Sequence, residues 1–343
     1  MQNLEEFRKA LDKSDKIVII PHRRPDADAL GSCLAMAGYL KKKGLHPQVV
    51  SPDDYPAFLH WMHGNEEVLI YENQYNSGHK KKAEAAIAEA DMIFCLDFSS
   101  LDRIENLKPF VSASAARKVL IDHHLGKSDF ADFEMWDTSA AATAELVFDL
   151  VSQMGDRHLL DVGMAECIYA GIMTDTGSFK YSSTSSKVHR IVADLLDLGI
   201  KAERIHRLIF DTNTEKRIKF LGYALDKKLT ILREYKTAYI SITAGELKRF
   251  ESRTGDTEGL VNYALSIEGI RLAAMFIDRT EAINISFRSV GDFAVNEFAS
   301  KHFNGGGHKN AAGGKVGRPL KDVVGKFLGL LDDYQAELVS PEE

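Results

Sequence analysis

The chain contains 343 residues, of which 45% are hydrophobic and 27% are charged, proportions that are ordinary for globular domains. Its formal net charge of −7 at pH 7 excludes a broad basic surface that would hold a long nucleic acid through many phosphate contacts. A small phosphate ligand, held by a few local arginine, lysine and histidine side chains, is compatible with this charge.

Three cysteines, Cys33, Cys95 and Cys167, lie far apart, each in an apolar segment. This spacing predicts reduced thiols in a core rather than a disulfide or a zinc site. The first residues form an acidic amphipathic pattern with no apolar signal-peptide core behind it, and no apolar run reaches the length needed to span a bilayer. We therefore expect a cytoplasmic enzyme.

Strands and helices alternate through the first half of the chain. Apolar runs predict strands at residues 16–20, 48–51, 68–71, 92–96 and 119–121, and helical patterns lie at residues 30–42, 80–90, 100–107, 140–154 and 164–173. This rhythm favours the α/β class, with a mostly parallel sheet that carries helices on both faces.

The stretch PHRRPDADALGS at residues 21–32 follows the first of these strands. It places His22, Asp26 and Asp28 on the loop at the carboxyl end of that strand, where open α/β sheets hold their ligands. Two neighbouring carboxylates repel unless a cation or a proton lies between them, and oxygen ligands with an imidazole suit Mn²⁺ or Mg²⁺. The alternative is an acidic surface loop with a solvated histidine.

Further acidic and imidazole side chains follow the later strands. Asp97 comes directly after the run MIFCL, Asp122, His123 and His124 follow KVLI, and Asp175 lies in a polar turn after an apolar helical pattern. Each has a structural alternative, as a helix cap, a turn residue or a core histidine. Since the strand-following groups share the carboxyl edge of one sheet with His22, we expect a single site.

The character of the sequence changes near residue 186. A charged helical stretch precedes strand-like runs at residues 228–233, 238–243, 270–277 and 282–287 and helix-like patterns at 259–266 and 296–303. We predict a catalytic domain at residues 1–185, a helical linker at 186–215, and a smaller α+β domain at 216–343.

A glycine-rich motif, GGGHKNAAGG, lies at residues 305–314 of the second half. Consecutive glycines allow backbone N–H groups to approach a bound anion closely, and His308 adds a further polar group. Arg288, in the preceding FRS sequence, is of the type that binds phosphate through two parallel hydrogen bonds. The alternatives are a flexible loop and an ordinary surface charge.

Together these motifs resemble those of the DHH phosphoesterase family over nearly the whole chain. HRRPDADALGS resembles the first motif of that family, Asp97 the second, Asp122–His124 the third and TDTG at 174–177 the fourth. The sequences FRS and GGGHKNAAGG resemble the family's associated C-terminal domain. The size and the GGGH motif are similar to those of the branch of small oligoribonucleases (nanoRNases) and adenosine 3′,5′-bisphosphate phosphatases.

This resemblance implies two manganese ions, for which Mg²⁺ or Co²⁺ would be the substitutes. It implies that His22 and Asp26 bind the first ion, that a second set of ligands binds the other, and that Asp97 bridges both. His124 would act at the reacting phosphate, and Asp122 would orient a ligand imidazole. The remaining implied residues are the second metal's ligands Asp28, His123 and Asp175, and the substrate-binding residues Arg288, Ser289, Gly305, Gly306, Gly307 and His308, which would face the metals across a closing cleft.

We therefore expect a manganese-dependent phosphodiesterase that releases mononucleotides exonucleolytically from very short oligonucleotides, with 3′-phosphatase action on adenosine 3′,5′-bisphosphate as a further activity. Its partners would be these substrates, without a long nucleic-acid track or a membrane, and a homodimer is compatible with the sequence. One alternative is a polyphosphate or pyrophosphate hydrolase, which stays open because no row of aromatic residues for base stacking is evident. Others are a phosphodiesterase for linear breakdown products of cyclic dinucleotides and a nucleotide-binding regulator without turnover, against which the intact metal motifs argue.

Overall fold

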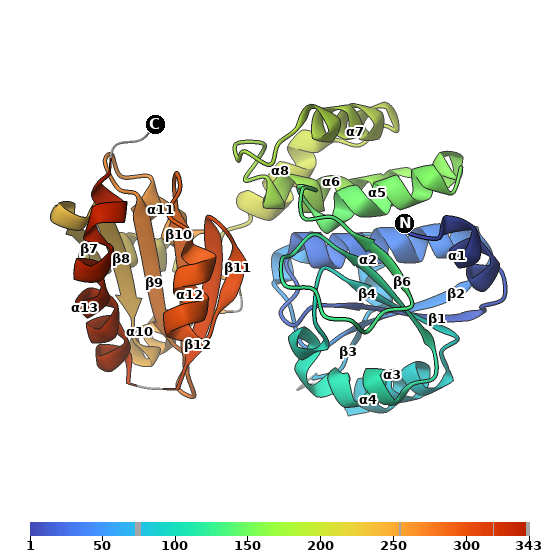
Figure 1. The fold of residues 1–343 in the computed structure, drawn as a ribbon, viewed down its shortest axis with the longest axis horizontal. Helices are drawn as coiled ribbons and strands as arrows, with labels where there is room; N and C mark the ends of the chain where they lie inside the picture. The colour runs from blue at the N-terminus through green and yellow to red at the C-terminus, as the bar shows by residue number, and fades with distance from the viewer. Residues whose placement is uncertain (73–76, 254, 318, 341–343) are drawn as a thin grey trace. The chain divides into compact units, whose positions relative to one another are not determined.

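The chain forms two compact units in the computed structural model, Met1–Thr212 and Asn213–Glu343, and the structure describes residues 1–72, 77–253, 255–317 and 319–340 (Figure 1). The helices of the segment for which we predicted a linker, α7 (Ser186–Asp197) and α8 (Ala202–Phe210), bury apolar side chains in the core of the first unit. No helix in the described ranges is both long enough and apolar enough to cross a membrane.

The first unit is built on a six-stranded sheet in which every neighbouring pair is parallel, as predicted. The strand order is β3-β2-β1-β4-β5-β6, so the order reverses between β1 and β4. Ligands of such sheets bind at the carboxyl ends of the strands beside this reversal. The strands are β1 (Lys16–Pro21), β2 (His46–Ser51), β3 (Leu69–Ile70), β4 (Met92–Leu96), β5 (Arg117–Asp122) and β6 (Phe133–Trp136).

Helices cover both faces of this sheet because its strands alternate between two cores. Ile17 and Ile19 of β1 join one core, and Val18 and Ile20 join the other. Figure 1 shows α2, α5 and α6 on the first face and α3 and α4 on the second. The helices of this unit, besides α7 and α8, are α1 (Leu4–Leu11), α2 (Ala27–Lys42), α3 (Ser77–Glu89), α4 (Lys108–Ala113), α5 (Thr143–Gln153), α6 (Val162–Asp175) and the short turns η1 (Ala57–Leu59), η2 (Asn65–Glu67), η3 (Leu101–Leu107) and η4 (Arg157–Leu159).

Helix α2 begins earlier than the sequence pattern predicted. The side chain of Asp26 is the N-cap and accepts hydrogen bonds from the backbone N–H groups of Asp28 (3.1 Å) and Ala29 (3.0 Å). Asp28 therefore lies in the first helical turn, fully buried. Its prediction as a loop residue was wrong, because the capping carboxylate two residues earlier starts the helix.

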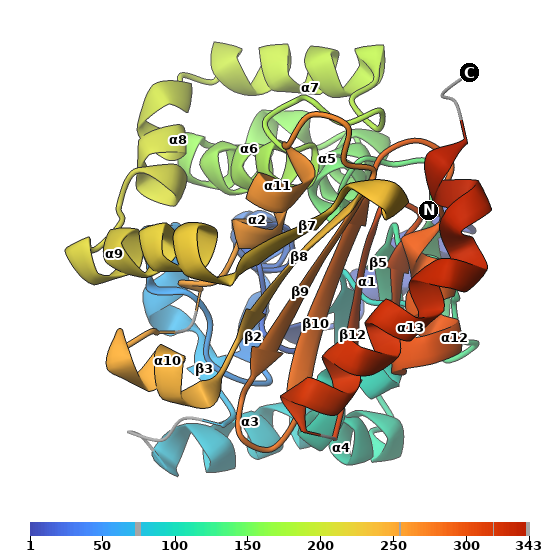
Figure 2. The same ribbon diagram turned by 90° about the vertical axis from the view of Figure 1, so that its left-hand side faces the viewer.

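The second unit contains a mixed sheet of six strands in the order β11-β12-β10-β9-β8-β7, in which only β8 and β9 are parallel. Figure 2 shows α12 and α13 on one face of this sheet and α10 and α11 on the other. The elements are β7 (Leu229–Leu232), β8 (Thr237–Ile242), β9 (Leu272–Asp278), β10 (Ile283–Ser289), β11 (Gly306–His308), β12 (Ala311–Val316), α9 (Glu215–Tyr223), η5 (Ala224–Lys228), η6 (Arg233–Tyr235), α10 (Ala244–Arg249), α11 (Leu260–Leu265), α12 (Val295–Phe303) and α13 (Leu320–Val339).

The GGGH motif forms an edge strand of this second sheet, so the flexible-loop alternative was wrong. A Cβ atom at Gly305 would lie 1.9 Å from the carbonyl oxygen of Gly313. Gly307 has φ +139°, and a Cβ there would lie 2.5 Å from the carbonyl oxygen of Ala311. Glycine is therefore required at both positions for the close approach of β11 and β12.

A prediction for stability follows from the close packing of α2 on α6. A Cβ atom at Gly31 would lie 2.5 Å from the backbone oxygen of Cys167, which cannot move independently of its helix. We expect Gly31→Ala to lower the free energy of unfolding by about 1–3 kcal/mol, measured by urea denaturation. The control is Gly38→Ala on the same helix, whose Cβ would meet only the flexible side chain of Met164 and which should cost clearly less. Equal losses would contradict this packing.

Candidate metal centre

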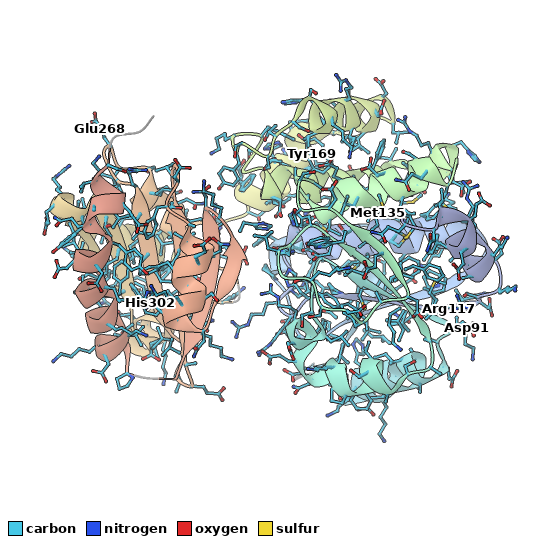
Figure 3. All side chains as sticks on the ribbon, viewed as in Figure 1. Asp91, Arg117, Met135, Tyr169, Glu268 and His302 are labelled. Carbon is cyan, nitrogen blue, oxygen red and sulfur yellow. The ribbon has the colours of Figure 1, made fainter. Side chains whose placement is uncertain are left out.

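The centre of the site is the carboxylate of Asp97, directly after β4. Asp91 and Arg117 mark the amino ends of β4 and β5 in Figure 3, so Asp97 and Asp122 lie at the opposite edge of the sheet. Asp97 is 1% exposed and has φ +66°, a left-handed conformation that costs a residue with a side chain about 1–3 kcal/mol. Its backbone N–H donates to the carbonyl oxygen of Ile121 at 3.0 Å, which holds this turn against β5.

Three imidazoles surround this one carboxylate. Oδ2 of Asp97 lies 3.4 Å from Nε2 of His22. Its other oxygen, Oδ1, lies 3.5 Å from Nε2 of His123 and 3.5 Å from Nδ1 of His124. The two oxygens of Asp97 therefore face two different groups of ligands, as expected for a carboxylate that bridges two metal ions.

The structure brings all the predicted ligands together in two groups. The first group consists of His22, Asp26 and Asp97, and the members of the second group come from three separate elements. Within each group the ligand atoms lie within 4.8 Å of one another. Carboxylate oxygens with one imidazole are the donor set that suits hard divalent cations, so these residues fit such an ion. The second group is Asp28, His123 and Asp175.

Backbone carbonyl groups orient both of these histidines. Nδ1 of His22 lies 2.8 Å from the carbonyl oxygen of Arg23, and Nδ1 of His123 lies 3.2 Å from that of Ala140. An imidazole that donates from Nδ1 presents the lone pair of Nε2, the atom that faces the carboxylates here. This arrangement is typical of histidines that bind metal ions.

Burial and the neighbouring charges shift the pKa values of His22, Asp97 and Asp28. Burial would lower the pKa of His22, but its hydrogen bond to Asp97 and the charge of Asp26 raise it to about 9. Burial would raise the pKa of Asp97, but His22, His124 and His123 together hold it well below its usual range. Burial and the charges of Asp97 and Asp175 raise the pKa of Asp28. A divalent cation would relieve this repulsion between carboxylates.

The amino end of α5 supplies partners that the sequence pattern did not reveal. The backbone N–H groups of Thr143 and Ala144 donate to Oδ2 and Oδ1 of Asp28 at 2.7 and 2.9 Å, and the Thr143 hydroxyl donates to Asp97 at 2.8 Å. We expected this helix to begin three residues earlier, at residue 140, so its N-terminal amides were not assigned to the site. A threonine before an apolar helical pattern was the only available signal.

Asp53 is another residue that sequence reasoning missed. It lies after β2, is 9% exposed, and its two carboxylate oxygens accept from Nε of Arg23 (2.8 Å) and from the backbone N–H of Arg24 (2.5 Å). Arg24 has φ +53°, so this carboxylate holds a strained turn between His22 and Asp26. Within SPDDYP, Asp53 has the pattern of an ordinary turn residue.

Asp122 and His124 form a separate pair beside the two groups. Oδ1 of Asp122, which is fully buried, lies 2.8 Å from Nδ1 of His124, whose side chain is 21% exposed. We had expected Asp122 to orient a ligand imidazole; its hydrogen-bond partner is instead the histidine for which we predicted a role at the phosphate. A third group, with ligand atoms within 4.8 Å of one another, consists of Asp97, Asp122 and His124. His124 could therefore bind a metal ion or carry a proton, and the variant described below distinguishes these two roles.

The predicted substrate-binding residues of the second unit lie on or next to two strands, β10 and β11, which are separated in the sheet by β12. Arg288 of β10 and His308 of β11 are both in register with Ala311 of β12, so their side chains are on one face of the sheet, about 10 Å apart. Nη1 of Arg288 also donates to the carbonyl oxygen of Phe287 at 2.9 Å. Ser289 differs, because its buried hydroxyl donates to Phe293 and accepts from Asn310 within the unit.

Comparison with known proteins agrees with this geometry. The model of the DHH family N-terminal domain matches residues 16–172, and that of the DHHA1 domain matches residues 235–337. The bifunctional oligoribonuclease and PAP phosphatase NrnA of Thermus thermophilus is 30% identical over 91% of this chain and 87% of its own length. The chain belongs to the DHH family of phosphoesterases.

Two further proteins resemble this DHH-family chain along nearly its whole length. The enzyme of the same name from Bacillus subtilis is 27% identical over 91% of this chain and 92% of its own length. A crystal structure of an exopolyphosphatase-related protein from Bacteroides fragilis is 38% identical, with a TM-score of 0.91 over 98% of this chain and 97% of that one. The fold of both units is therefore shared with a solved structure.

The shared position of Asp97 gives the first prediction for the site. We expect Asp97→Ala to weaken the binding of both metal ions and to abolish turnover, because the two oxygens of this carboxylate face the two groups. Metal content of the purified variant, measured by mass spectrometry, checks it. Asp102→Ala, on the exposed surface of the same connection, should retain the parent's content. Two tightly bound ions in the Asp97 variant would contradict the bridging assignment.

His124→Ala should behave differently, because we assign this histidine to proton transfer. Its metal content should stay near that of the parent, while the chemical step slows by roughly 10²–10⁴-fold, the usual contribution of one acid–base group. Single-turnover kinetics together with metal analysis measure the two effects separately. A collapse of metal content would instead make His124 a ligand of the third group.

Proposed function

We propose that this chain is a manganese-dependent phosphodiesterase that releases mononucleotides from very short oligoribonucleotides and removes the 3′-phosphate of adenosine 3′,5′-bisphosphate. The single observation that carries the proposal is the Asp97 carboxylate, with one oxygen facing the His22 group and the other facing His123 and His124. Support for the substrates comes from the relatives of Thermus and Bacillus, which are named oligoribonuclease and PAP phosphatase.

The chemistry depends on six ligands and one proton carrier. A bound pair of divalent ions would supply Lewis acidity and a water molecule of lowered pKa at neutral pH. His124, oriented by Asp122, contacts the reacting phosphate and gives a proton to the leaving ribose oxygen. Thr143 and Asp53 act indirectly. Thr143 holds the carboxylates of Asp28 and Asp97, and Asp53 holds the loop between His22 and Asp26. The proposed ligands are His22, Asp26, Asp28, Asp97, His123 and Asp175.

The second unit would bind the part of the substrate that does not react. We assign this role to the row of Arg288 and His308 with the backbone of Gly305–Gly307, since an arginine and close backbone N–H groups suit a phosphate. The Ser289 hydroxyl is occupied by Phe293 and Asn310, so we propose that it holds the end of β10.

A polyphosphate hydrolase is the second candidate. The observation that favours it is the crystal structure with a TM-score of 0.91, whose protein is described as exopolyphosphatase-related. The same metal centre would serve either substrate, because both reactions displace an oxygen from phosphorus.

A product time course separates the two candidates. The protein is incubated with a diribonucleotide, a set of longer labelled oligoribonucleotides, adenosine 3′,5′-bisphosphate and polyphosphate, each with Mn²⁺ and with Mg²⁺. We expect the diribonucleotide to be cleaved fastest, with higher rates in Mn²⁺ and with rates that fall as the oligonucleotide lengthens, because a net charge of −7 does not favour an extended basic track. Faster release of phosphate from polyphosphate would overturn the proposal.

Arg288→Ala tests the role of the second unit. If Arg288 binds a distant phosphate, kcat/KM on a diribonucleotide should fall by roughly 10–100-fold, the effect of losing one charge-assisted hydrogen bond. An aryl phosphate ester without a second phosphate should be hydrolysed nearly as before, and His308→Ala should give the same pattern. The control is Arg233→Ala, an exposed arginine elsewhere in the unit. Equal losses on both substrates would contradict this assignment.

A further inference from the structure

Trp136 is an exposed aromatic side chain at the carboxyl edge of the first sheet, the edge that carries the metal centre. It ends β6, and its Cα is in register with that of Asp122 on β5. Residues in register on neighbouring parallel strands point their side chains to the same face, about 4.8 Å apart. The indole is therefore the next side chain along the sheet from the carboxylate that orients His124.

A hydrogen bond fixes this indole to the DHH sequence itself. Nε1 of Trp136 donates to the backbone oxygen of His124 at 2.7 Å. The ammonium group of Lys127 lies 5.6 Å from the centre of the ring and is paired with Glu134, two residues before Trp136 on the same strand. These contacts hold the ring in one orientation, so little conformational entropy would be lost when a ligand stacks on it.

Two large apolar side chains close to His124 are exposed to solvent. Trp136 is 38% exposed, and Leu125, which follows His124 directly, is 49% exposed. Inorganic phosphates have no apolar part that such a surface could cover, whereas a nucleotide places a flat base one sugar away from its phosphate. Stacking on an aromatic ring is how proteins bind bases without selecting their sequence.

From these contacts we propose that Trp136, together with Leu125 next to His124, is the nucleobase subsite of the metal centre. The proposal deepens the proposed function and rests on it. In this subsite, the base of the nucleotide next to the scissile bond stacks on the indole, while its phosphate is held beside His124. The substrate would therefore be a nucleotide rather than an inorganic phosphate. It also supplies the aromatic contact that the sequence did not make evident.

The intrinsic fluorescence of Trp136 tests this directly. The chain has two tryptophans, so Trp61→Phe leaves Trp136 as the single fluorophore. This protein, loaded with Mn²⁺, is titrated with adenosine 5′-monophosphate, with ribose 5-phosphate and with inorganic tripolyphosphate. We expect saturable quenching by the nucleotide and little change with the two ligands that lack a base. No quenching by the nucleotide, or equal quenching by ribose 5-phosphate, would overturn the proposal.

Steady-state kinetics on a diribonucleotide separate stacking from a structural role. Trp136→Ala should raise KM by roughly 5–100-fold, whereas Trp136→Phe, which keeps a ring but loses the indole N–H, should recover most of the affinity. If both variants lose the same amount, the hydrogen bond to His124 is what matters, and the subsite is wrong. Phe110→Ala, an exposed aromatic residue on α4, is the control and should leave KM unchanged.

The parent protein, assayed on the same diribonucleotide, distinguishes failure of this inference from failure of the proposed function. If the parent cleaves the diribonucleotide but the Trp136 variants retain its KM, only the subsite is wrong. If the parent does not cleave it, the proposed function fails first.

Discussion

The proposed metal centre depends on one buried carboxylate that lies between two groups of candidate ligands. Asp97 is held in a left-handed conformation at the end of β4, where the strand order reverses, and its two oxygens point to imidazoles from different elements. The cost of this backbone conformation must be offset by the surrounding contacts, among them the bonds to Ile121 and Thr143. A residue without a carboxylate at this position could not offer an oxygen to each of the two groups.

The arrangement of the neighbouring helices stabilises one of the buried carboxylates. Asp28 would be costly to bury alone, and the amino end of α5 reduces this cost with two backbone N–H groups and the positive end of its dipole. Such an approach requires α2, α5 and α6 to lie close together. At Gly171 of α6, a Cβ atom would lie 2.6 Å from Asp28 Oδ1. A glycine at this position therefore allows α6 to pack closely against the buried carboxylate.

Much of this could be predicted from the sequence because the signals were local. Apolar runs located five of the six parallel strands, and the residues that follow three of them include five of the six proposed ligands; Asp175 instead ends a helix. The four-residue strand β6 was missed because FEMW is too short for a periodic pattern, and Trp136 was missed with it. The contributions of Thr143 and Asp53 to the site were not predicted, because they depend on contacts with residues 46 and 30 positions away, which no local sequence pattern reveals.

The central claim is that two metal ions share Asp97, and anomalous diffraction from crystals grown with Mn²⁺ tests it most directly. The account predicts two manganese peaks about 3.5–4 Å apart, with the Asp97 carboxylate in contact with both. One ion would be bound by His22 and Asp26, and the other by Asp28, His123 and Asp175. A single peak, or a second ion held by Asp122 and His124 without Asp28, would contradict it.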